Sequence, residues 1–233
     1  MSNRSDVLDR IARSARAAGR DPSGVRLVGV TKEVAPPWAA ELFRLGTADL
    51  GENRADGLEE KRRWLGEQGL APRWHFIGHL QRNKARRVLE LADEIHSVDS
   101  VRLWEALARL AHEVGRFPGI YLQVKLHDEP SKGGLAPAEL GPLVERARGG
   151  PLPLLGLMTM APLLAEGERA RAEARRVFAE LGALARTLPG AAFAGGRPRL
   201  SMGMSGDFED AIGAGADVVR VGGALFEGCE GAP

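Results

Sequence analysis

Hydrophobic residues recur along this chain with two different periods. Near the start, Val7, Ile11, Ala15 and Ala18 follow one another at steps of three and four residues, which places one apolar stripe on a helix. Gly19 comes directly after the stripe and is a typical stop signal for a helix. Beyond it, short apolar runs alternate with longer amphipathic stretches, which indicates strands alternating with helices.

Eight of the short runs have the length and composition of buried strands. They are residues 26–32 (RLVGVTK), 48–53 (ADLGEN), 74–78 (WHFIG), 94–99 (EIHSVD), 120–126 (IYLQVKL), 154–160 (LLGLMTM), 199–205 (RLSMGMS) and 217–222 (DVVRVG). The clearest helical stretches between them lie at 101–114 and 170–184. This alternation, with no second block of different character, predicts an α/β fold: a parallel sheet closed into a single (β/α)8 TIM barrel with an extra N-terminal helix. We expect residues 1–233 to form one domain.

Composition narrows the class of protein and of partner. The 233 residues carry 32 basic and 31 acidic side chains, so at a net charge of +1 neither nucleic acid nor a membrane surface is the expected partner. Cys229 is the only cysteine, which excludes an internal disulfide and favours a reducing compartment. No apolar run approaches the roughly 18 residues of a membrane span, and the N-terminal pattern is not that of a signal peptide. We therefore expect a cytoplasmic monomer with a small-molecule ligand.

The TIM barrel predicts where functional groups lie, because its strands carry them at their C-terminal ends. At these ends the sequence has Lys32, Asn53, His79 and Met158, with further candidates at 201–205 and 220–223. Lys32 follows the run VGVT, and an amine partly removed from water there would favour the neutral form that attacks an aldehyde. From position alone, a solvated lysine at the end of a strand is the alternative.

The last two strands end in segments suited to a phosphate. Ser205 ends the seventh predicted strand, and either Ser205 or Asp207 can cap the short helix that comes next. After the eighth strand, Gly222 and Gly223 can bring bare backbone N–H groups close to an anion, at the position where this fold usually binds phosphate. The alternative is that the two glycines only form a tight turn.

Arg220 precedes Gly222 by two residues on the same strand, so its guanidinium can point into the barrel and face a heterocyclic nitrogen. A fixed positive charge there would oppose protonation of that nitrogen and weaken the ring as an electron sink. A salt bridge with an acid inside the barrel is the competing explanation. A reactive lysine, a phosphate-binding segment and this arginine together indicate pyridoxal 5′-phosphate (PLP).

Two other signals carry less weight. His75 and His79 are four residues apart, but on a strand that spacing separates them by about 13 Å, so we expect no zinc site between them. A basic cluster, typical of a solvated helix face, consists of Arg82, Lys84, Arg86 and Arg87.

Several motifs follow one another as they do in one known family. They are VGVTK, LGEN, WHFIGHLQRNK, IHSVDS, SKGG, GLMTM, LSMGMSGDFEDAI and VVRVGGALF, and they span nearly the whole chain. With them the chain resembles the pyridoxal phosphate homeostasis proteins (the YggS/PROSC family), relatives of the barrel domain of alanine racemase. The resemblance implies that Lys32 binds PLP covalently as a Schiff base, with Asn53 near the ring and Arg220 near the pyridine nitrogen. It further implies a phosphate site of Ser201, Gly222 and Gly223, and neighbours His79, Met158, Met202 and Ser205.

The chain departs from the family pattern at three places. Arg54 stands where the family usually has tyrosine, Lys125 stands where it has asparagine, and Glu227 interrupts the usual FG ending. The lysine and the phosphate-binding segment are retained, so the departures concern contacts to the ring and the closure of the C-terminal segment.

Two functions are compatible with a PLP site: a carrier or buffer of PLP, and a PLP-dependent amino-acid racemase. Racemisation needs a second acid/base opposite the lysine, which alanine racemases take from an additional β domain. The only tyrosine, Tyr121, opens the fifth predicted strand and is expected at the bottom of the barrel, away from the site. We therefore expect a PLP-binding protein without catalytic residues or a metal. By resemblance, it supplies or buffers PLP in vitamin B6 and amino-acid homeostasis, with PLP-dependent apo-enzymes as partners.

Overall fold

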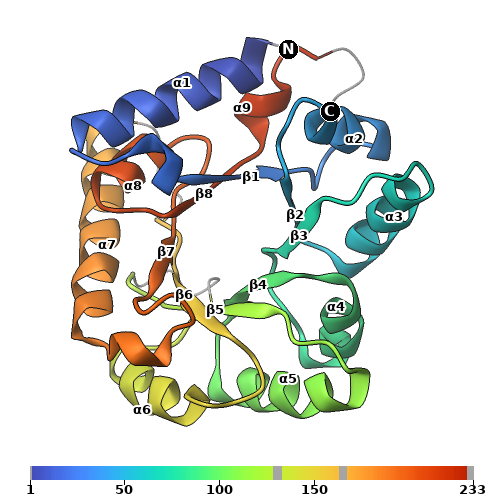
Figure 1. Cartoon of the computed structure of the whole chain (residues 1–233). Coiled ribbons are helices and arrows are strands. Elements are labelled where there is room, and N and C mark those ends of the chain that lie inside the picture. Colours follow the sequence, from blue (N-terminus) through green and yellow to red (C-terminus); the bar gives the residue numbers. More distant parts are fainter. Residues whose placement is uncertain (1, 128–132, 163–166, 230–233) are drawn as a thin grey trace.

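The structure is a computed structural model that describes residues 2–127, 133–162 and 167–229. Its strands pair in parallel and in chain order, and the last closes on the first to form a barrel (Figure 1). They are β1 (Arg26–Val30), β2 (Asp49–Glu52), β3 (Arg73–Phe76), β4 (Glu94–Val98), β5 (Gly119–Gln123), β6 (Leu154–Met158), β7 (Arg199–Ser201) and β8 (Val218–Val221). The predicted TIM barrel is confirmed, and a strand lies in each of the eight predicted runs.

Helices surround the barrel (Figure 1). The predicted extra helix is α1 (Ser2–Ala17), which packs against α8 and α9. The others are α2 (Pro36–Arg44), α3 (Ala55–Gly66), α4 (Ala85–Leu91), α5 (Val101–Val114), α6 (Pro137–Ala147), α7 (Glu168–Thr187), α8 (Phe208–Gly213) and α9 (Gly223–Phe226), with 3-10 turns η1 (Pro22–Gly24), η2 (Arg82–Lys84) and η3 (Gly190–Ala192). Within the described ranges, no helix combines the length and hydrophobicity that crossing a bilayer requires.

Helix α5 shows how the sequence specifies these elements locally. Ser100 caps its start, because the serine hydroxyl accepts a hydrogen bond from the backbone N–H of Leu103 at 3.3 Å. Gly115 ends the helix with φ at 69°, a conformation that glycine adopts without steric cost. Leu103, Leu107 and Ala111 are buried on one face, so the apolar stripe of the sequence holds the helix against the barrel.

Apolar side chains pack in two separate regions. The larger core lies between strands and helices and includes Leu50 and Leu107, both fully buried. Gly29 faces this core, since a Cβ there would touch Leu42 of α2, so its neighbour Val28 points to the other side, into the barrel. The interior apolar cluster consists of Val28, Tyr121, Met158 and Val218. Polar side chains occupy much of the remaining interior.

Some predicted boundaries differ from the observed ones. β1 ends at Val30 and not at residue 32, so Lys32 lies in the following loop. Likewise β7 ends at Ser201, four residues before the end of the predicted run. The predicted place of Tyr121 at the opening of its strand is wrong: β5 begins at Gly119, and Tyr121 lies in the middle of the strand. Residues 131–132, the first half of the SKGG motif, lie outside the described residues.

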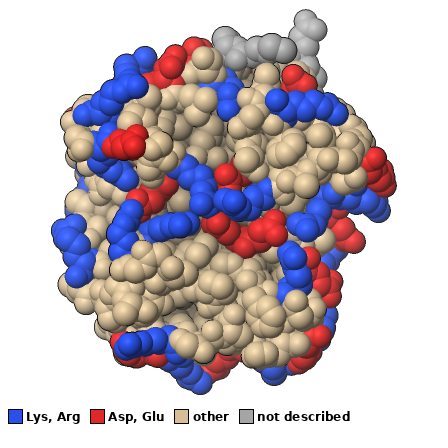
Figure 2. Space-filling view, in the orientation of Figure 1, with Lys and Arg blue, Asp and Glu red and all other residues tan. Residues whose placement is uncertain are grey.

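Positive and negative side chains are mixed on the face shown in Figure 2. In the predicted basic cluster, too, positive side chains lie beside negative ones. Arg86 pairs with Glu113 of α5, and Arg87 pairs with Asp56 and Glu59 of α3. Half of the cluster therefore links neighbouring helices instead of forming an uncompensated basic patch.

Gly78 follows β3, and a Cβ at this position would lie only 2.0 Å from the backbone carbonyl oxygen of Asn53. We expect Gly78→Ala to lower the free energy of unfolding by roughly 1–3 kcal/mol, the usual range for overpacking, because one of the two backbones must move. The matched control is Gly66→Ala at the end of α3, where a Cβ meets no described atom within 4 Å. Urea denaturation of both variants tests this, and equal stability of the two would contradict it.

Candidate functional site

A cavity of about 570 Å³ lies where β1 and β8 end. Its lining includes Lys32, Gly222 and Gly223, together with Val30, Glu33, Val34, Phe226, Glu227, Gly228 and Cys229. The lysine that follows the first strand and the glycines that follow the last meet here because β1 and β8 are paired in the closed barrel. A volume in this range can hold a small organic ligand.

Lys32 lies in the loop between β1 and α2, two residues beyond the end of the strand. Its side chain is 44% exposed, and its Nζ lies 3.4 Å from Oε1 of Glu33. Lys32 is thus exposed in the structure, so a partly desolvated amine stays a prediction. It also stands beside a carboxylate, which the sequence reasoning did not consider.

The two glycines of the cavity differ in their surroundings. A Cβ on Gly222 would lie 3.3 Å from both the Cβ and the carbonyl oxygen of Val30, so a side chain there would crowd β1. A Cβ on Gly223 would meet no described atom within 4 Å. The N–H of Gly222 donates to the hydroxyl of Ser205 at 3.2 Å, and Gly223 begins α9, whose first N–H groups have no partner within the helix. The backbone at this end of the cavity can therefore donate to an anion.

A buried ion pair holds together the ends of β1 and β2. Oε1 of Glu52 lies 2.7 Å from Nζ of Lys61 on α3, and the two side chains are 1% and 5% exposed. The same oxygen accepts a hydrogen bond from the Thr31 hydroxyl at 2.6 Å. Thr31 directly precedes Lys32, and Glu52 directly precedes the half-buried Asn53. The pair thus fixes the backbone beside two predicted site residues.

Arg220 is almost completely buried inside the barrel. Its Nη1 donates to the Ser201 hydroxyl at 2.7 Å, and its Nη2 donates to the Thr159 carbonyl at 3.1 Å. Both hydrogen-bond acceptors are uncharged, whereas the carboxylate of Asp207 acts on the guanidinium through its negative charge. Burial lowers the pKa of the guanidinium to about 10, which still leaves it charged at neutral pH. A contact between Ser201 and a phosphate stays a prediction, since in the structure its hydroxyl bonds within the barrel.

The remaining predicted site residues lie in different environments. Nδ1 of the exposed His79 is 3.2 Å from Oδ2 of Asp99, beyond the end of β3. Met158 belongs to the interior apolar cluster, whereas Met202 is fully buried in the larger core. Both methionines therefore pack within the protein, and a direct contact of either with a ligand stays a prediction.

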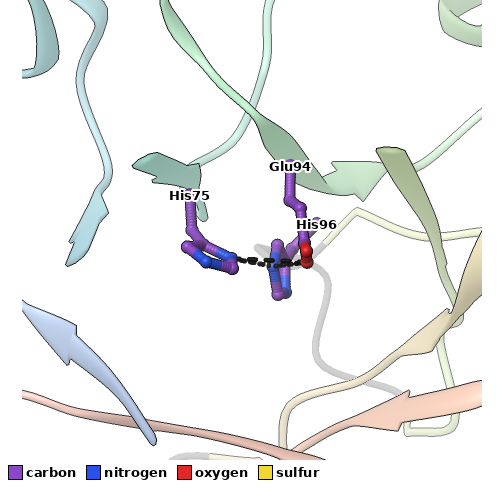
Figure 3. A group of neighbouring side chains, drawn as sticks. All are labelled: His75, Glu94 and His96. Carbon is purple, nitrogen blue, oxygen red and sulfur yellow. Dashed lines mark hydrogen bonds and ion pairs between the residues drawn. The ribbon is translucent and has the colours of Figure 1, made fainter. Parts of the chain in front are cut away.

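Sequence reasoning missed a group of buried polar residues in the interior. His75 of β3 and Glu94 and His96 of β4 point toward one another, as Figure 3 shows. One possible metal-ligand atom from each lies within 4.8 Å of the others. His75 and His79 have different partners, and the spacing within one strand could not reveal a neighbour on the next strand. One sequence feature could have pointed to this group: the third and fourth predicted strands each carry a histidine, His75 and His96.

The three departures from the family pattern lie near the mouth of the barrel. Arg54 is exposed at the start of α3, and the half-buried Lys125 follows β5. Glu227 lines the cavity beside Lys32, and its carbonyl oxygen accepts a hydrogen bond from the Asn3 amide at 2.6 Å. This bond joins the C-terminal segment to α1, so the extra glutamate is accommodated without loss of the cavity.

No protein-family model matches the chain, but curated proteins match nearly its whole length. A pyridoxal phosphate homeostasis protein of Aquifex aeolicus is 35% identical over 223 residues, which cover 95% of each chain. The corresponding protein of Pseudomonas aeruginosa is 39% identical, over 96% of this chain and 93% of its own. Among solved structures, PipY of Synechococcus elongatus without PLP has a TM-score of 0.81 at 36% identity, and the match covers 94% of this chain and 99% of PipY.

More distant structures share only the fold. Alanine racemase of Streptomyces lavendulae has a TM-score of 0.69 at 20% identity, and the match covers 94% of this chain but 57% of the racemase. Fold and cavity together define a class of TIM-barrel proteins with a lysine after the first strand and backbone donors after the last. Within that class, the chain belongs to the family of pyridoxal phosphate homeostasis proteins.

The ion pair of Glu52 and Lys61 supports a specific stability prediction. Lys61→Met should lower the free energy of unfolding by about 3–5 kcal/mol, because the buried carboxylate of Glu52 loses its compensating charge. The double variant Glu52→Gln/Lys61→Met, in which neither charge is present, should recover part of this loss. Denaturant titration measures both values, and a double variant less stable than Lys61→Met alone would refute the assignment.

Proposed function

We propose that this protein binds PLP in the cavity at the ends of β1 and β8, holds it as a Schiff base on Lys32, and acts in PLP homeostasis. The observation that carries the proposal is that Lys32, Gly222 and Gly223 line the same cavity. The relatives are named pyridoxal phosphate homeostasis proteins, and PipY, at 35% identity, was also solved with PLP bound. These names and that complex support PLP as the ligand.

Each group of the site has its own task in this proposal. PLP supplies an aldehyde, a phosphate and a pyridine ring. The amine of Lys32 would condense with the aldehyde and release water. The backbone N–H groups of Gly222 and Gly223 would bind the phosphate, for which the Gly222 N–H must share its proton between the phosphate and the Ser205 hydroxyl. Asn53 lies beside the ring, and Ser205, which already accepts from the Gly222 N–H, orders the phosphate-binding backbone.

Arg220 has an electronic role in the proposal. Its guanidinium faces the pyridine nitrogen and, as a charged group, opposes protonation of the ring, which weakens the ring as an electron sink. A bound cofactor with a weak electron sink is suited to storage and transfer rather than to carbanion chemistry. We therefore propose a cytoplasmic monomer that passes PLP to PLP-dependent apo-enzymes and has no catalytic residues of its own.

A racemase is the alternative function, and the position of Tyr121 speaks against it. This tyrosine is fully buried, and its ring stacks on His96 with centroids 4.3 Å apart. Burial also raises the pKa of its hydroxyl, so it is a poor proton carrier at neutral pH. Among the described residues, Tyr121 is therefore not placed to act as a second acid/base opposite Lys32.

Lys32→Ala should abolish the PLP adduct that borohydride reduction fixes on the wild-type protein, because the amine that forms the covalent bond is removed. Lys84→Ala, at an exposed position of η2, is the control and should be labelled like the wild type. Mass spectrometry of proteolytic peptides locates the adduct. A main adduct on another lysine in the wild type would refute the assignment to Lys32.

The PLP-loaded protein should show no turnover of alanine or other common amino acids at an ordinary enzymatic rate, on the order of 1 to 1000 per second. The physical reason is that the proposal assigns no second acid/base to the face of the ring opposite the lysine. Chiral chromatography of the amino acid after incubation measures racemisation. A rate within that range would favour the racemase over the carrier.

A further inference from the structure

A line of hydrogen bonds crosses the barrel interior from β8 to β2. Its links are Arg220 Nη1 to Ser201 Oγ at 2.7 Å, Ser201 Oγ to His96 Nδ1 at 2.8 Å, His96 Nε2 to His75 Nδ1 at 2.9 Å, and His75 Nε2 to Asp49 Oδ1 at 2.8 Å. Ser201, His96 and His75 are all 0% exposed. Each distance is that of a normal hydrogen bond, so the line is continuous.

The chemistry of the two ends gives every link one direction when His75 is neutral. A carboxylate only accepts, so His75 carries a proton on Nε2, and in the neutral ring Nδ1 then accepts from His96. His96 then carries its proton on Nε2, and its Nδ1 accepts from the Ser201 hydroxyl. The guanidinium of Arg220 only donates, which the free lone pair of Ser201 accommodates. In this order all donors point toward Asp49, and both histidines are neutral.

The charges around the line support this order. Burial lowers the pKa of His96 well below its usual value, and the charges of Arg220 and Arg26 act in the same direction. Burial alone would raise the pKa of Asp49, but the hydrogen bond from His75 and the charges of Arg26 and Arg73 outweigh it and lower that pKa. The acceptor end is thus ionised, and His96 is neutral.

The same histidines could instead bind a metal ion together with Glu94, but the geometry favours the hydrogen-bonded line. Two imidazole nitrogens bound to one tetrahedral zinc lie about 3.3 Å apart, given Zn–N bonds of about 2.0–2.1 Å, and both must be unprotonated. The 2.9 Å separation of Nδ1 and Nε2 fits a shared proton better. Nη1 of Arg26 also donates to Oε1 of Glu94 at 2.8 Å, which places a positive charge beside any metal ion that Glu94 would bind.

We infer that Asp49, His75, His96 and Ser201 are positioning residues that hold Arg220 in its ring-facing orientation through this ordered line. The inference rests on the proposed function, in which Arg220 faces the pyridine nitrogen. Because the Ser201 hydroxyl donates its proton to His96, the serine oxygen keeps a lone pair directed at Nη1 of Arg220. Without this hydrogen bond to His96, the hydroxyl can turn its proton toward Nη1, and the guanidinium then keeps only the Thr159 carbonyl as an acceptor.

The first test is nitrogen-15 NMR of the histidine side chains in the wild-type protein without PLP. The ordered line requires His75 and His96 to be neutral with the proton on Nε2, and equimolar Zn²⁺ should leave their signals unchanged. A proton on Nδ1 of either ring, a charged ring at pH 7, or displacement of both signals by Zn²⁺ would overturn the inference. This readout does not depend on PLP.

The second test is a double-mutant cycle on PLP affinity, measured by absorbance titration. Ser201→Ala should weaken PLP binding about tenfold in the wild-type background, as expected for loss of a hydrogen bond to a charged group. In the Arg220→Gln background it should have no further effect, because the serine acts through the arginine. The matched control is Ser97→Ala: this serine is also buried, on β4, and its hydroxyl has no hydrogen-bond partner in the described structure.

Two variants of His96 refine the second test. An asparagine oxygen can replace Nδ1 as acceptor for Ser201, whereas the longer glutamine places its amide near the former Nε2. His96→Asn should therefore retain more PLP affinity than His96→Gln. The opposite order would show that the link to His75, and not the link to Ser201, carries the effect.

The outcomes separate this inference from the proposed function. An equal loss of affinity on Ser201→Ala in both backgrounds would show that Ser201 contacts the phosphate directly, which overturns the positioning role but leaves PLP binding intact. Failure of the wild type to bind PLP would overturn the proposed function and the role of Arg220 toward the ring. The NMR result would then still decide whether the line is ordered as inferred.

Discussion

Closure of the sheet constrains everything else in this protein, because every second residue of each strand then points into an interior that solvent does not reach. A polar group placed there without a partner costs roughly 1–3 kcal/mol, so the inward polar residues must bond with one another. His75, His96 and Ser201 come from three strands and meet this requirement in a single line. The line ends in a carboxylate on one side and a guanidinium on the other, which gives it a direction.

A second buried arrangement secures the other side of the site. The ion pair of Glu52 and Lys61 is buried, and with the hydroxyl of Thr31 it fixes the ends of β1 and β2. Lys32 itself remains in a loop and partly exposed, where a ligand can reach it. Rigid elements thus carry the support and a loop carries the reactive group, a division common in barrel proteins.

The comparison with alanine racemase shows how one barrel serves different functions. The match covers 94% of this chain but little more than half of the racemase, so the shared part is the barrel. In this chain the single tyrosine packs inside the barrel against His96, where it contributes to the core. The barrel can present a lysine and backbone donors, but the fold alone does not decide what is done with a bound ligand. That decision depends on the groups that surround the site.

The sequence by itself determined the order of the elements and the set of strand ends, because apolar periodicity and strand length are local properties. These local properties predict the barrel and single out Lys32, Gly222 and Gly223 as candidate site residues. The structure places all three in the lining of one cavity. Only the tertiary structure decided what the inward side chains of β2, β3, β4, β7 and β8 contact. Which residues meet across a barrel depends on strand register and on side-chain directions. No local pattern encodes that register, so the line from Arg220 to Asp49 could not be derived from spacing along the chain.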